Sequence, residues 1–319
     1  MKLALLGTGM IVQDVLPVLK TIEGIELCGV LATAATVDEA AGFDAGPVFT
    51  DYAELLASDE IDTVYIGLPN FLHATFAIQA LKADKNVIIE KPFTVSFAEF
   101  EEVYAAAGSS KGFILEAITN QYAPNYLQIK NELDVVGDVK IVECNYSQYS
   151  SRYDAFKRGE ILPAFDPKKG GGALMDLNIY NIHFIVGLFG KPEGVQYHAN
   201  IERSVDTSGI LTLDYPTFKA VAIAAKDCAA KVSSTVQGNL GSFRVDGPPN
   251  IVEEVTLSLN NGETQTFEYH EHRMLAEFVE FEQIISSRDD EAAARRLAHS
   301  KNVMEVLDAA VKSAGLKLG

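Results

Sequence analysis

The sequence predicts an α/β protein with a doubly wound parallel sheet in its N-terminal half, followed by an α+β domain with a large, mostly antiparallel open sheet. Three observations predict this. The first 120 residues alternate short apolar runs with helical patterns, as in a parallel sheet covered by helices. The apolar residues then come in strand-length runs separated by turn signals. A chain of 319 residues also exceeds what one hydrophobic core usually serves.

The N-terminal half contains apolar runs of strand length with helical segments between them. A helical apolar period covers Leu72–Ala83, and Ser96-Phe97-Ala98-Glu99 matches a capping box before an amphipathic run to Ala107. Alternation of this kind predicts a doubly wound sheet. The predicted strands are Lys2–Leu6, Glu26–Leu31, Thr63–Gly67, Asn86–Glu90 and Phe113–Ala117.

The C-terminal half begins after a predicted helix near Pro124–Leu133, and we place the boundary near residues 118–123. Asn260-Asn261-Gly262 is a strong hairpin turn, and Tyr215-Pro216-Thr217 is a second tight connection, so we expect antiparallel pairing. Helices are predicted again at Arg273–Ser286 and Glu291–Ser313. The predicted strands are Lys140–Tyr149, Val195–Ile201, Ser208–Tyr215, Phe218–Ala225, Lys231–Gln237 and Glu254–Tyr269, the last one split by the hairpin turn.

Composition and charge exclude several classes of protein. The chain has 26 Lys and Arg against 44 Asp and Glu, a net charge of -18, which would repel nucleic acid and an anionic membrane surface. The apolar N-terminus is interrupted at Gly7, which disfavours a signal peptide, and we expect no later stretch to be long and apolar enough to span a bilayer. Cys28, Cys144 and Cys228 lack metal-site spacing, so we expect small core residues, no metal and a cytoplasmic location.

A glycine turn follows the first predicted strand. Gly7-Thr8-Gly9-Met10-Ile11 opens a helix, the context in which glycines let the backbone approach a pyrophosphate at the helix N-terminus. The third glycine of that pattern is replaced by Val12. Such a turn can also be purely structural, but its position after the first strand of an α/β sheet favours nucleotide binding.

The end of the second predicted strand leaves the choice between NAD and NADP open. A carboxylate that binds the ribose 2′-hydroxyl is expected there. The sequence instead has Leu31-Ala32-Thr33-Ala34, with neither an acid nor an arginine. Small residues at Ala32 and Thr33 would leave room for a 2′-phosphate.

Two later strand ends contribute further candidates, because ligands of an open α/β sheet bind outside the carboxyl ends of its strands. Pro92 holds the preceding Lys91 in an extended conformation, which would aim its side chain, although a lysine at a strand end is often only solvated. For Asn70 and His73, a helix cap and a first-turn imidazole compete equally with a role in lining the nicotinamide or ribose. The other candidates for cofactor binding at these two strand ends are Leu68, Pro69, Glu90 and Lys91 itself. Glu116, in the fifth predicted strand, could meet the cofactor or the domain hinge and is ranked below them.

In the second half, a flexible glycine turn at Gly170–Gly172 is predicted to lead into a helix. Asp176, Tyr180 and His183 follow at spacings of four and three, so they lie on one helical face. The neighbouring residues are apolar almost all round, as in a buried helix, so these polar groups need partners, and a lysine near them would supply one.

At these residues the sequence resembles the Gfo/Idh/MocA family, named for glucose–fructose oxidoreductase and inositol dehydrogenase. The similarity runs nearly end to end, and its specific part is the ordered combination of Glu90-Lys91-Pro92 with the glycine turn and Asp176. The motifs are Gly7-Thr8-Gly9, Leu68-Pro69-Asn70-Phe71-Leu72-His73, Glu90-Lys91-Pro92, Gly170–His183 and Val306-Leu307-Asp308-Ala309.

The resemblance implies an NAD(P)-binding Rossmann domain at residues 1–120. Residues 121–319 would form a substrate-binding and oligomerisation domain whose open sheet often carries a subunit interface, which implies a homodimer or homotetramer. It also places Lys91 and Asp176 in the catalytic constellation. Tyr180 stands where many members carry His, as in the branch resembling glucose–fructose oxidoreductase and dimeric dihydrodiol dehydrogenase, and His183 stands where others carry Asp.

The chemistry implied is hydride transfer between NAD or NADP and a sugar, polyol or related carbonyl substrate. Such a reaction needs a group that handles the hydroxyl proton, because otherwise an alkoxide must form. Tyr180 is the first candidate, since the Lys91 ammonium would lower the phenol pKa from its reference value of ~10. Lys91 would also bind the substrate oxygen, and Asp176 would orient the lysine or bind a second hydroxyl. Lys91 as the proton donor is the alternative.

The sequence is also compatible with two other functions. One is a non-catalytic NAD(P)-binding regulatory or sensor protein of the same fold. The other is a glycosidase-type enzyme that uses tightly held NAD with no net redox. Substrate contacts are expected from Ser150–Phe165, where Arg152, Tyr153 and Arg158 are unranked candidates.

Overall fold

The computed structural model describes residues 1–317, and the chain forms two compact units. The first contains Met1–Thr94, Ala98–Ala117 and Met274–Ser300. The second contains Val95–Phe97, Ile118–Arg273 and the chain from Lys301 onward. The functional division at residue 120 stays a prediction.

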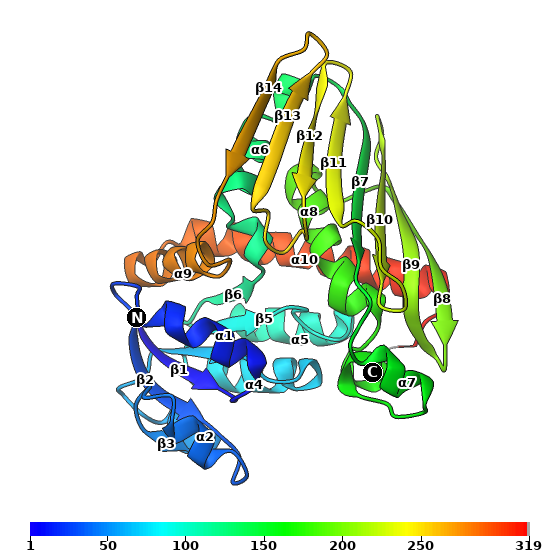
Figure 1. Cartoon of the computed structure of the whole chain (residues 1–319). Helices are drawn as coiled ribbons and strands as arrows, with labels where there is room; N and C mark the ends of the chain where they lie inside the picture. The colour runs from blue at the N-terminus through cyan, green and yellow to red at the C-terminus, as the bar shows by residue number, and fades with distance from the viewer. Residues whose placement is uncertain (318–319) are drawn as a thin grey trace. The chain divides into compact units, whose positions relative to one another are not determined.

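The first unit is built on a six-stranded parallel sheet of order β3-β2-β1-β4-β5-β6 (Figure 1). This is the strand order of a doubly wound dinucleotide fold, with the order reversing between β1 and β4. Strands β4, β5 and β6 are buried over their whole length and β1 over all but its first residue, which explains their continuous apolar runs. The predicted doubly wound sheet is therefore confirmed. Its strands are β1 (Lys2–Leu6), β2 (Glu26–Leu31), β3 (Val48–Phe49), β4 (Thr63–Ile66), β5 (Asn86–Glu90) and β6 (Ile114–Ala117).

Helices of this unit begin where the sequence places caps or turns. Helix α5 begins at Phe97, directly after the predicted cap Ser96, and α4 begins at His73. Helix α9 is joined to the sheet by an edge-to-face contact between Phe278 and Tyr65, whose ring centroids are 5.4 Å apart. The helices are α1 (Met10–Leu19), α2 (Val37–Ala41), α3 (Tyr52–Leu56), η1 (Asn70–Leu72), α4 (His73–Lys82), α5 (Phe97–Ala107), α9 (Leu275–Ser287) and the first part of α10 (Asp290–Ala314).

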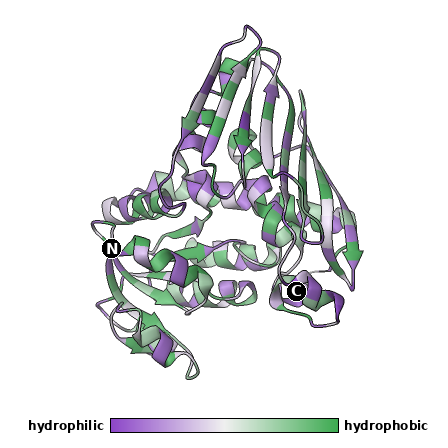
Figure 2. Ribbon diagram, viewed as in Figure 1, coloured by the Kyte–Doolittle hydropathy of each residue, from purple (hydrophilic) through white to green (hydrophobic). Residues whose placement is uncertain are grey.

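The second unit contains an eight-stranded sheet of order β14-β13-β12-β11-β7-β10-β9-β8 (Figure 1). All neighbours are antiparallel except β7 and β10, so the sheet is mixed but mostly antiparallel, as predicted. Hydrophobic and hydrophilic bands alternate along β11 to β14 (Figure 2), which is the pattern of a sheet with one covered face. The strands are β7 (Val139–Ser147), β8 (Gly194–Glu202), β9 (Val205–Asp214), β10 (Lys219–Ala225), β11 (Ser233–Gly238), β12 (Gly241–Asp246), β13 (Glu254–Leu259) and β14 (Thr264–Glu268).

Helix α8 (Ile179–Phe189) packs against β7 and β10 of this sheet. A π-helical turn, η6 (Leu174–Asn178), leads into it. Asn178 and Asn181 donate side-chain hydrogen bonds to the carbonyls of Ala222 and Ile223 in β10, at 3.2 and 3.0 Å. These bonds fix the rotation of the helix on the sheet. The remaining short helices are η2 (Thr119–Gln121), α6 (Pro124–Asn131), η3 (Leu133–Val136), α7 (Tyr153–Lys157), η4 (Pro163–Phe165) and η5 (Pro167–Lys169).

Two expectations about apolar segments are corrected. Within the described residues, Pro167–Phe189 is long and apolar enough to cross a membrane by length and composition, with a mean hydropathy of 1.3. An 18-residue apolar window of this segment is 72% buried inside the structure, as in the core helix of a folded unit. Of the cysteines, only Cys144 is buried; Cys28 is partly exposed and Cys228 is exposed, because Cys228 lies beyond the end of β10.

Candidate functional site

The turn between β1 and α1 has the form that a dinucleotide requires. Gly7 adopts φ +102°, which favours glycine, and its N–H donates to the carbonyl of Leu31 at 3.0 Å. Gly9 is the N-cap of α1, and a Cβ added there would meet no described atom within 4 Å. A pyrophosphate could therefore approach the N-terminus of this helix. Among the other candidates in this turn, Thr8 is buried, Met10 is exposed and Ile11 is partly buried.

The missing third glycine is explained by a glycine on a neighbouring strand end. That third glycine normally allows close packing of helix on strand. Val12 is fully buried, and a Cβ added to Gly67 would lie 2.6 Å from its Cγ2 atom. Gly67, directly after β4, thus provides the space that Val12 occupies. The sequence pattern is altered, but the close packing is retained.

The end of β2 presents hydroxyl groups. Ala32 is buried, whereas Thr33 is exposed and its hydroxyl lies 3.1 Å from that of Thr36. The Thr36 hydroxyl also accepts a hydrogen bond from the backbone N–H of Thr33 at 3.1 Å. These groups could donate to a phosphate as readily as to a ribose hydroxyl.

His73 connects the ends of β4 and β5. Its Nε2 lies 2.9 Å from the carbonyl of Leu68, and its Nδ1 lies 3.0 Å from the carbonyl of Pro92. The ring is fully buried, and burial lowers its pKa, although the carbonyl contacts oppose this shift. This geometry favours the structural role for His73. Nearby, Pro69 is exposed, and Leu68 and Asn70 are partly buried.

Lys91 lies in the turn that His73 supports. Its peptide bond to Pro92 is cis, and its side chain is partly buried. The preceding Glu90 is buried and accepts a hydrogen bond from the Tyr65 hydroxyl at 2.6 Å. Glu116 accepts one from Ser300 at 2.5 Å. The first unit thus gathers the predicted cofactor turn, the end of β4 and the Glu90–Pro92 turn at the carboxyl ends of its strands.

In the second unit, Asp176 forms an ion pair that the sequence analysis did not identify. Its Oδ2 lies 2.8 Å from the ammonium of Lys226, which directly follows β10. Only 2% of the Lys226 side chain is exposed, against 40% for Asp176. The buried helical pattern around Asp176 predicts a lysine partner, but nothing local in the sequence points to a lysine 50 residues away.

The glycine turn before Asp176 is tightly packed, not flexible as expected. A Cβ on Gly171 would lie 2.6 Å from the backbone N of Asp166. Gly172 adopts φ +119°, and its Cβ would lie 2.1 Å from Oδ1 of Asp206. Asp206 is fully buried and accepts from the N–H of Leu174 at 2.6 Å and the Tyr197 hydroxyl at 2.8 Å. Burial raises the pKa of Asp206 to about 6.

Tyr180 and His183 lie on the buried helix α8. Tyr180 is 8% exposed, and its ring centroid lies 6.1 Å from that of Tyr146 in β7. Asn120 donates to the Tyr180 carbonyl at 2.9 Å, and Gln121 donates to the His183 carbonyl at 2.8 Å. His183 is fully buried.

The three candidates for substrate contacts in the segment 150–165 have different surroundings. Tyr153 belongs to a small buried cluster with Phe156, Phe165 and Val205, and it donates to Glu202 at 2.7 Å. This hydrogen bond is the main reason why the pKa of Tyr153 is raised to about 12. Tyr153 is therefore part of the packing of α7. Arg152 and Arg158 are exposed at its two ends.

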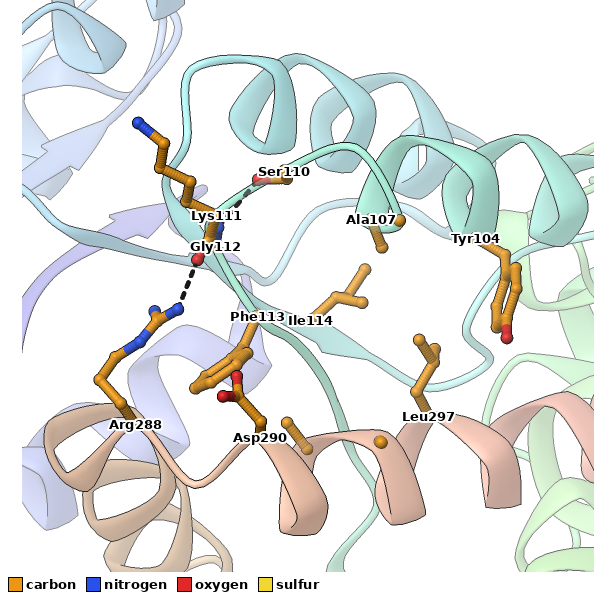
Figure 3. Close-up of a pocket in the computed structure, with 13 residues that line it drawn as sticks. Tyr104, Ala107, Ser110, Lys111, Gly112, Phe113, Ile114, Arg288, Asp290 and Leu297 are labelled. Atoms are coloured by element: carbon orange, nitrogen blue, oxygen red, sulfur yellow. Dashed lines mark hydrogen bonds between the residues drawn. The ribbon is translucent and has the colours of Figure 1, made fainter.

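A pocket of about 390 Å³ in the first unit lies away from the strand ends just described (Figure 3). It is lined by the end of α5, the start of β6 and the start of α10, with Arg288 stacked 4.1 Å from the Phe113 ring. None of the predicted site residues lines it. Within residues 1–317, no group of three or more His, Cys, Asp and Glu side chains could hold a metal ion.

The structure thus brings together two sets of predicted residues, one in each unit. The convergence of Lys91 with Asp176 and Tyr180 stays a prediction, because these residues belong to different units.

Comparison with known proteins agrees with this architecture. Residues 1–117 match a family model described as an oxidoreductase family with an NAD-binding Rossmann fold. Residues 127–244 match the Gfo/Idh/MocA C-terminal domain. The chain belongs to the Gfo/Idh/MocA family. It is therefore an NAD(P)-dependent oxidoreductase by family, and the resemblance noted in the sequence is confirmed.

Relatives in this family act on several kinds of hydroxyl compound. The chain is 31% identical over 320 residues to scyllo-inositol 2-dehydrogenase (NADP(+)) IolU of Bacillus subtilis, covering 99% of this chain and 97% of that protein. It is 26% identical to trans-1,2-dihydrobenzene-1,2-diol dehydrogenase of Xenopus laevis, over 84% of this chain and 81% of the relative.

Among solved structures, KijD10, a 3-ketoreductase from Actinomadura kijaniata in complex with NADP and TDP-benzene, superposes with a TM-score of 0.83. The alignment covers 98% of this chain and 97% of that one at 21% identity. This similarity establishes the fold: a parallel Rossmann sheet followed by a mixed, mostly antiparallel sheet.

Proposed function

We propose that this protein is an NADP-dependent dehydrogenase or reductase that interconverts a secondary hydroxyl and a carbonyl on a cyclic polyol or sugar. The observation that carries the proposal is the similarity, over nearly the full length of both chains, to a scyllo-inositol 2-dehydrogenase that uses NADP(+). The candidate residues of both units fit this chemistry.

The end of β2 supports NADP over NAD. An acid there would repel a 2′-phosphate and bind a ribose 2′-hydroxyl instead. The chain has Ala32, Thr33 and Ala34 at this point, and the Thr33 and Thr36 hydroxyls lie side by side. D-xylose 1-dehydrogenase of Hypocrea jecorina, a relative 26% identical over 70% of this chain and 62% of its own length, is also named for NADP(+).

The candidate catalytic residues have two roles, which are to bind the substrate oxygen and to transfer the hydroxyl proton. When bound, the nicotinamide supplies or accepts the hydride. Tyr180 would give or take the hydroxyl proton, and Lys91 would favour its phenolate form and hold the substrate oxygen. Asp176, ionised beside Lys226, would accept a hydrogen bond from Lys91 or from a second substrate hydroxyl.

We further propose that the protein acts in the cytoplasm as a homodimer or homotetramer. Three widely spaced cysteines, none of them in a disulfide among the described residues, fit a reducing compartment. Exposed apolar residues on one face of the eight-stranded sheet support assembly.

The experiment that tests the function is fluorescence titration with NADPH and NADH separately, followed by a screen of inositols, aldoses and diols with the preferred cofactor. We expect tighter binding of NADPH and a change in reduced-nicotinamide absorbance with at least one cyclic polyol. Lys91→Met and Tyr180→Phe should each lower kcat by about 10²–10⁴-fold, and Tyr180→Phe should retain cofactor binding.

The alternatives give other outcomes. Cofactor binding without turnover on any substrate would indicate a sensor. Cofactor that survives gel filtration, together with glycoside cleavage and no net redox, would indicate a glycosidase-type enzyme.

A further inference from the structure

Lys226 holds three different parts of the second unit together. Its ammonium donates to Oδ2 of Asp176 at 2.8 Å and to the backbone carbonyl of Ala164 at 2.6 Å. It also lies 4.7 Å from the centroid of the Phe165 ring. Its own backbone N–H donates to the carbonyl of Thr207 in β9 at 2.8 Å, which fixes the position from which the side chain extends. The ammonium therefore links β10, the segment 163–165 and the start of the helical segment that carries Tyr180.

Stability alone is a weak explanation for this arrangement. Removing an ammonium from water is costly, and replacing a buried ion pair by apolar side chains of similar size is often neutral or stabilising. The site is apolar enough for such a replacement, because Phe165 is fully buried beside the ammonium. A buried lysine with one partly exposed carboxylate partner is better explained by what it does to that carboxylate.

The ion pair fixes Asp176 in charge and in direction. A carboxylate beside an ammonium stays ionised and accepts hydrogen bonds more strongly. Since Oδ2 is held by Lys226 and 40% of the Asp176 side chain remains exposed, the carboxylate has one oxygen anchored in the core and a solvent-facing side. A hydroxyl or an ammonium arriving from that side would find the acceptor already oriented.

The same ammonium also fixes the segment before the glycine turn. The Ala164 carbonyl that accepts from Lys226 also accepts from the N–H of Gly172, at 3.1 Å. Gly172 in turn lies against Asp206. The orientation of Asp176 and the path of residues 163–172 thus depend on one side chain.

We propose that Lys226 is a positioning residue of the active site, which keeps the Asp176 carboxylate ionised and oriented for a substrate hydroxyl and holds the 163–172 segment in place. The substrate part of this statement rests on the proposed function. Lys226 is not a catalytic residue, because at 2% exposure it acts through Asp176.

Two other acids lie near this ion pair and must be considered when the pH dependence of kcat/KM is interpreted. Burial raises the pKa of Asp206, on β9, and the charge of Lys226 opposes this rise. Asp227 follows Lys226 in the chain and accepts from the hydroxyls of Thr207 and Ser208 at 2.7 and 2.9 Å. The acid whose titration should change most is Asp176, because it alone of these three forms an ion pair with Lys226 among the described residues.

The test is a double-mutant cycle in the full-length enzyme with Lys226→Met, Asp176→Asn and the double variant. We expect each single variant to lower kcat/KM by about 10²-fold and the double variant to be no worse than Asp176→Asn, because Lys226 acts through Asp176. In Lys226→Met, the acidic limb of the kcat/KM profile should move to higher pH, and the affinity for NADPH should change by less than about 3-fold.

Lys231→Met is the matched control. This lysine also pairs with an aspartate, Asp246, at 3.0 Å, but it is 76% exposed, and the substitution should leave all parameters unchanged. Losses that multiply in the double variant, or an unaltered pH profile in Lys226→Met, would overturn the proposal. If Lys226→Met does not fold, Lys226→Arg and Lys226→Gln replace it, and the variant that keeps the cation should retain the larger activity.

A readout without turnover separates this proposal from the proposed function. Limited trypsin digestion of the cofactor-free protein should cleave at Arg158, Lys168 or Lys169 at least 10-fold faster in Lys226→Met than in Lys231→Met. Wild-type protein that turns over no polyol would refute the proposed function alone. Equal digestion rates in the two variants would refute the positioning role in the 163–172 segment.

Discussion

A single buried carboxylate, Asp206, should make stability depend on pH. Its pKa is raised from 3.8 to about 6, mainly by burial, so the folded protein binds this proton more tightly than the unfolded chain. The stabilisation is therefore fully present below about pH 4 and is lost as the pH rises through about 6. This rise in the Asp206 pKa corresponds to about 3 kcal/mol of free energy of unfolding.

Urea unfolding of the wild type and Asp206→Asn between pH 4 and 8 measures this effect. The free energy of unfolding of the wild type, relative to the variant, should fall by up to about 3 kcal/mol between pH 4 and 7 and then stay constant. A difference that does not change with pH would contradict the assignment.

Residue-scale predictions succeeded where a local pattern determines the conformation and failed where the partner is remote. Gly7 was expected to supply the tight turn, and it adopts the positive φ that this requires. Val12 departs from the glycine motif, and only the structure shows that Gly67, directly after β4, provides its space. Lys226 could not be found at all, since no local periodicity links a strand end to an acid 50 residues earlier.

At the scale of elements, the glycine turn before η6 should tolerate no side chain at Gly172. An alanine there would need φ +119° and a Cβ 2.1 Å from Asp206 Oδ1, so strain and overpacking add. We expect Gly172→Ala to lower the free energy of unfolding by about 3–5 kcal/mol.

Gly159→Ala is the control, because Gly159 also has a positive φ of +97° but would meet no described atom within 4 Å. Its cost should be only about 1–2 kcal/mol. Chemical denaturation of the two variants provides the comparison. Equal losses would mean that the contact with Asp206 does not constrain the turn.

Elements with a strong period were predicted well, and short elements were missed. The strand from Asn86 to Glu90 and the helix from Pro124 agree with the structure, because continuous apolar runs and a proline at a helix start are local signals. Strand β3 has two residues, and β12 begins with Gly241-Ser242, so neither carries such a signal. The π-helical turn at Leu174–Asn178 was also not predictable, because it forms where helix, glycine turn and sheet meet.

At the scale of the whole molecule, the uncovered face of the eight-stranded sheet should mediate self-association. Ile141 on β7 and Ile210 on β9 are 49% and 46% exposed, on the face opposite the buried Val142 and Leu211. Ile210 pairs with Ile223, which extends the apolar face across β10. We expect a dimer or tetramer in sedimentation analysis and a shift of Ile210→Asp toward monomer.

Leu240→Asp provides the control for this prediction. Leu240 is 57% exposed but lies in the turn between β11 and β12, outside the strands that form this face, so the variant should keep the wild-type assembly. The prediction would be wrong if the wild type is a monomer, or if the Ile210→Asp variant sediments with the same assembly mass as the wild type.

The sequence by itself determined the fold class, the family and the order of the candidate motifs, because these depend on periodicity, turn chemistry and motifs that follow one another along the chain. The tertiary structure decided how the motifs are supported. It assigned His73 to two backbone carbonyls, Gly67 to the space beside Val12 and Lys226 to Asp176. Each of these pairings joins strand or helix ends that are distant in sequence, and only the packing of the sheets and helices brings such ends within hydrogen-bond distance.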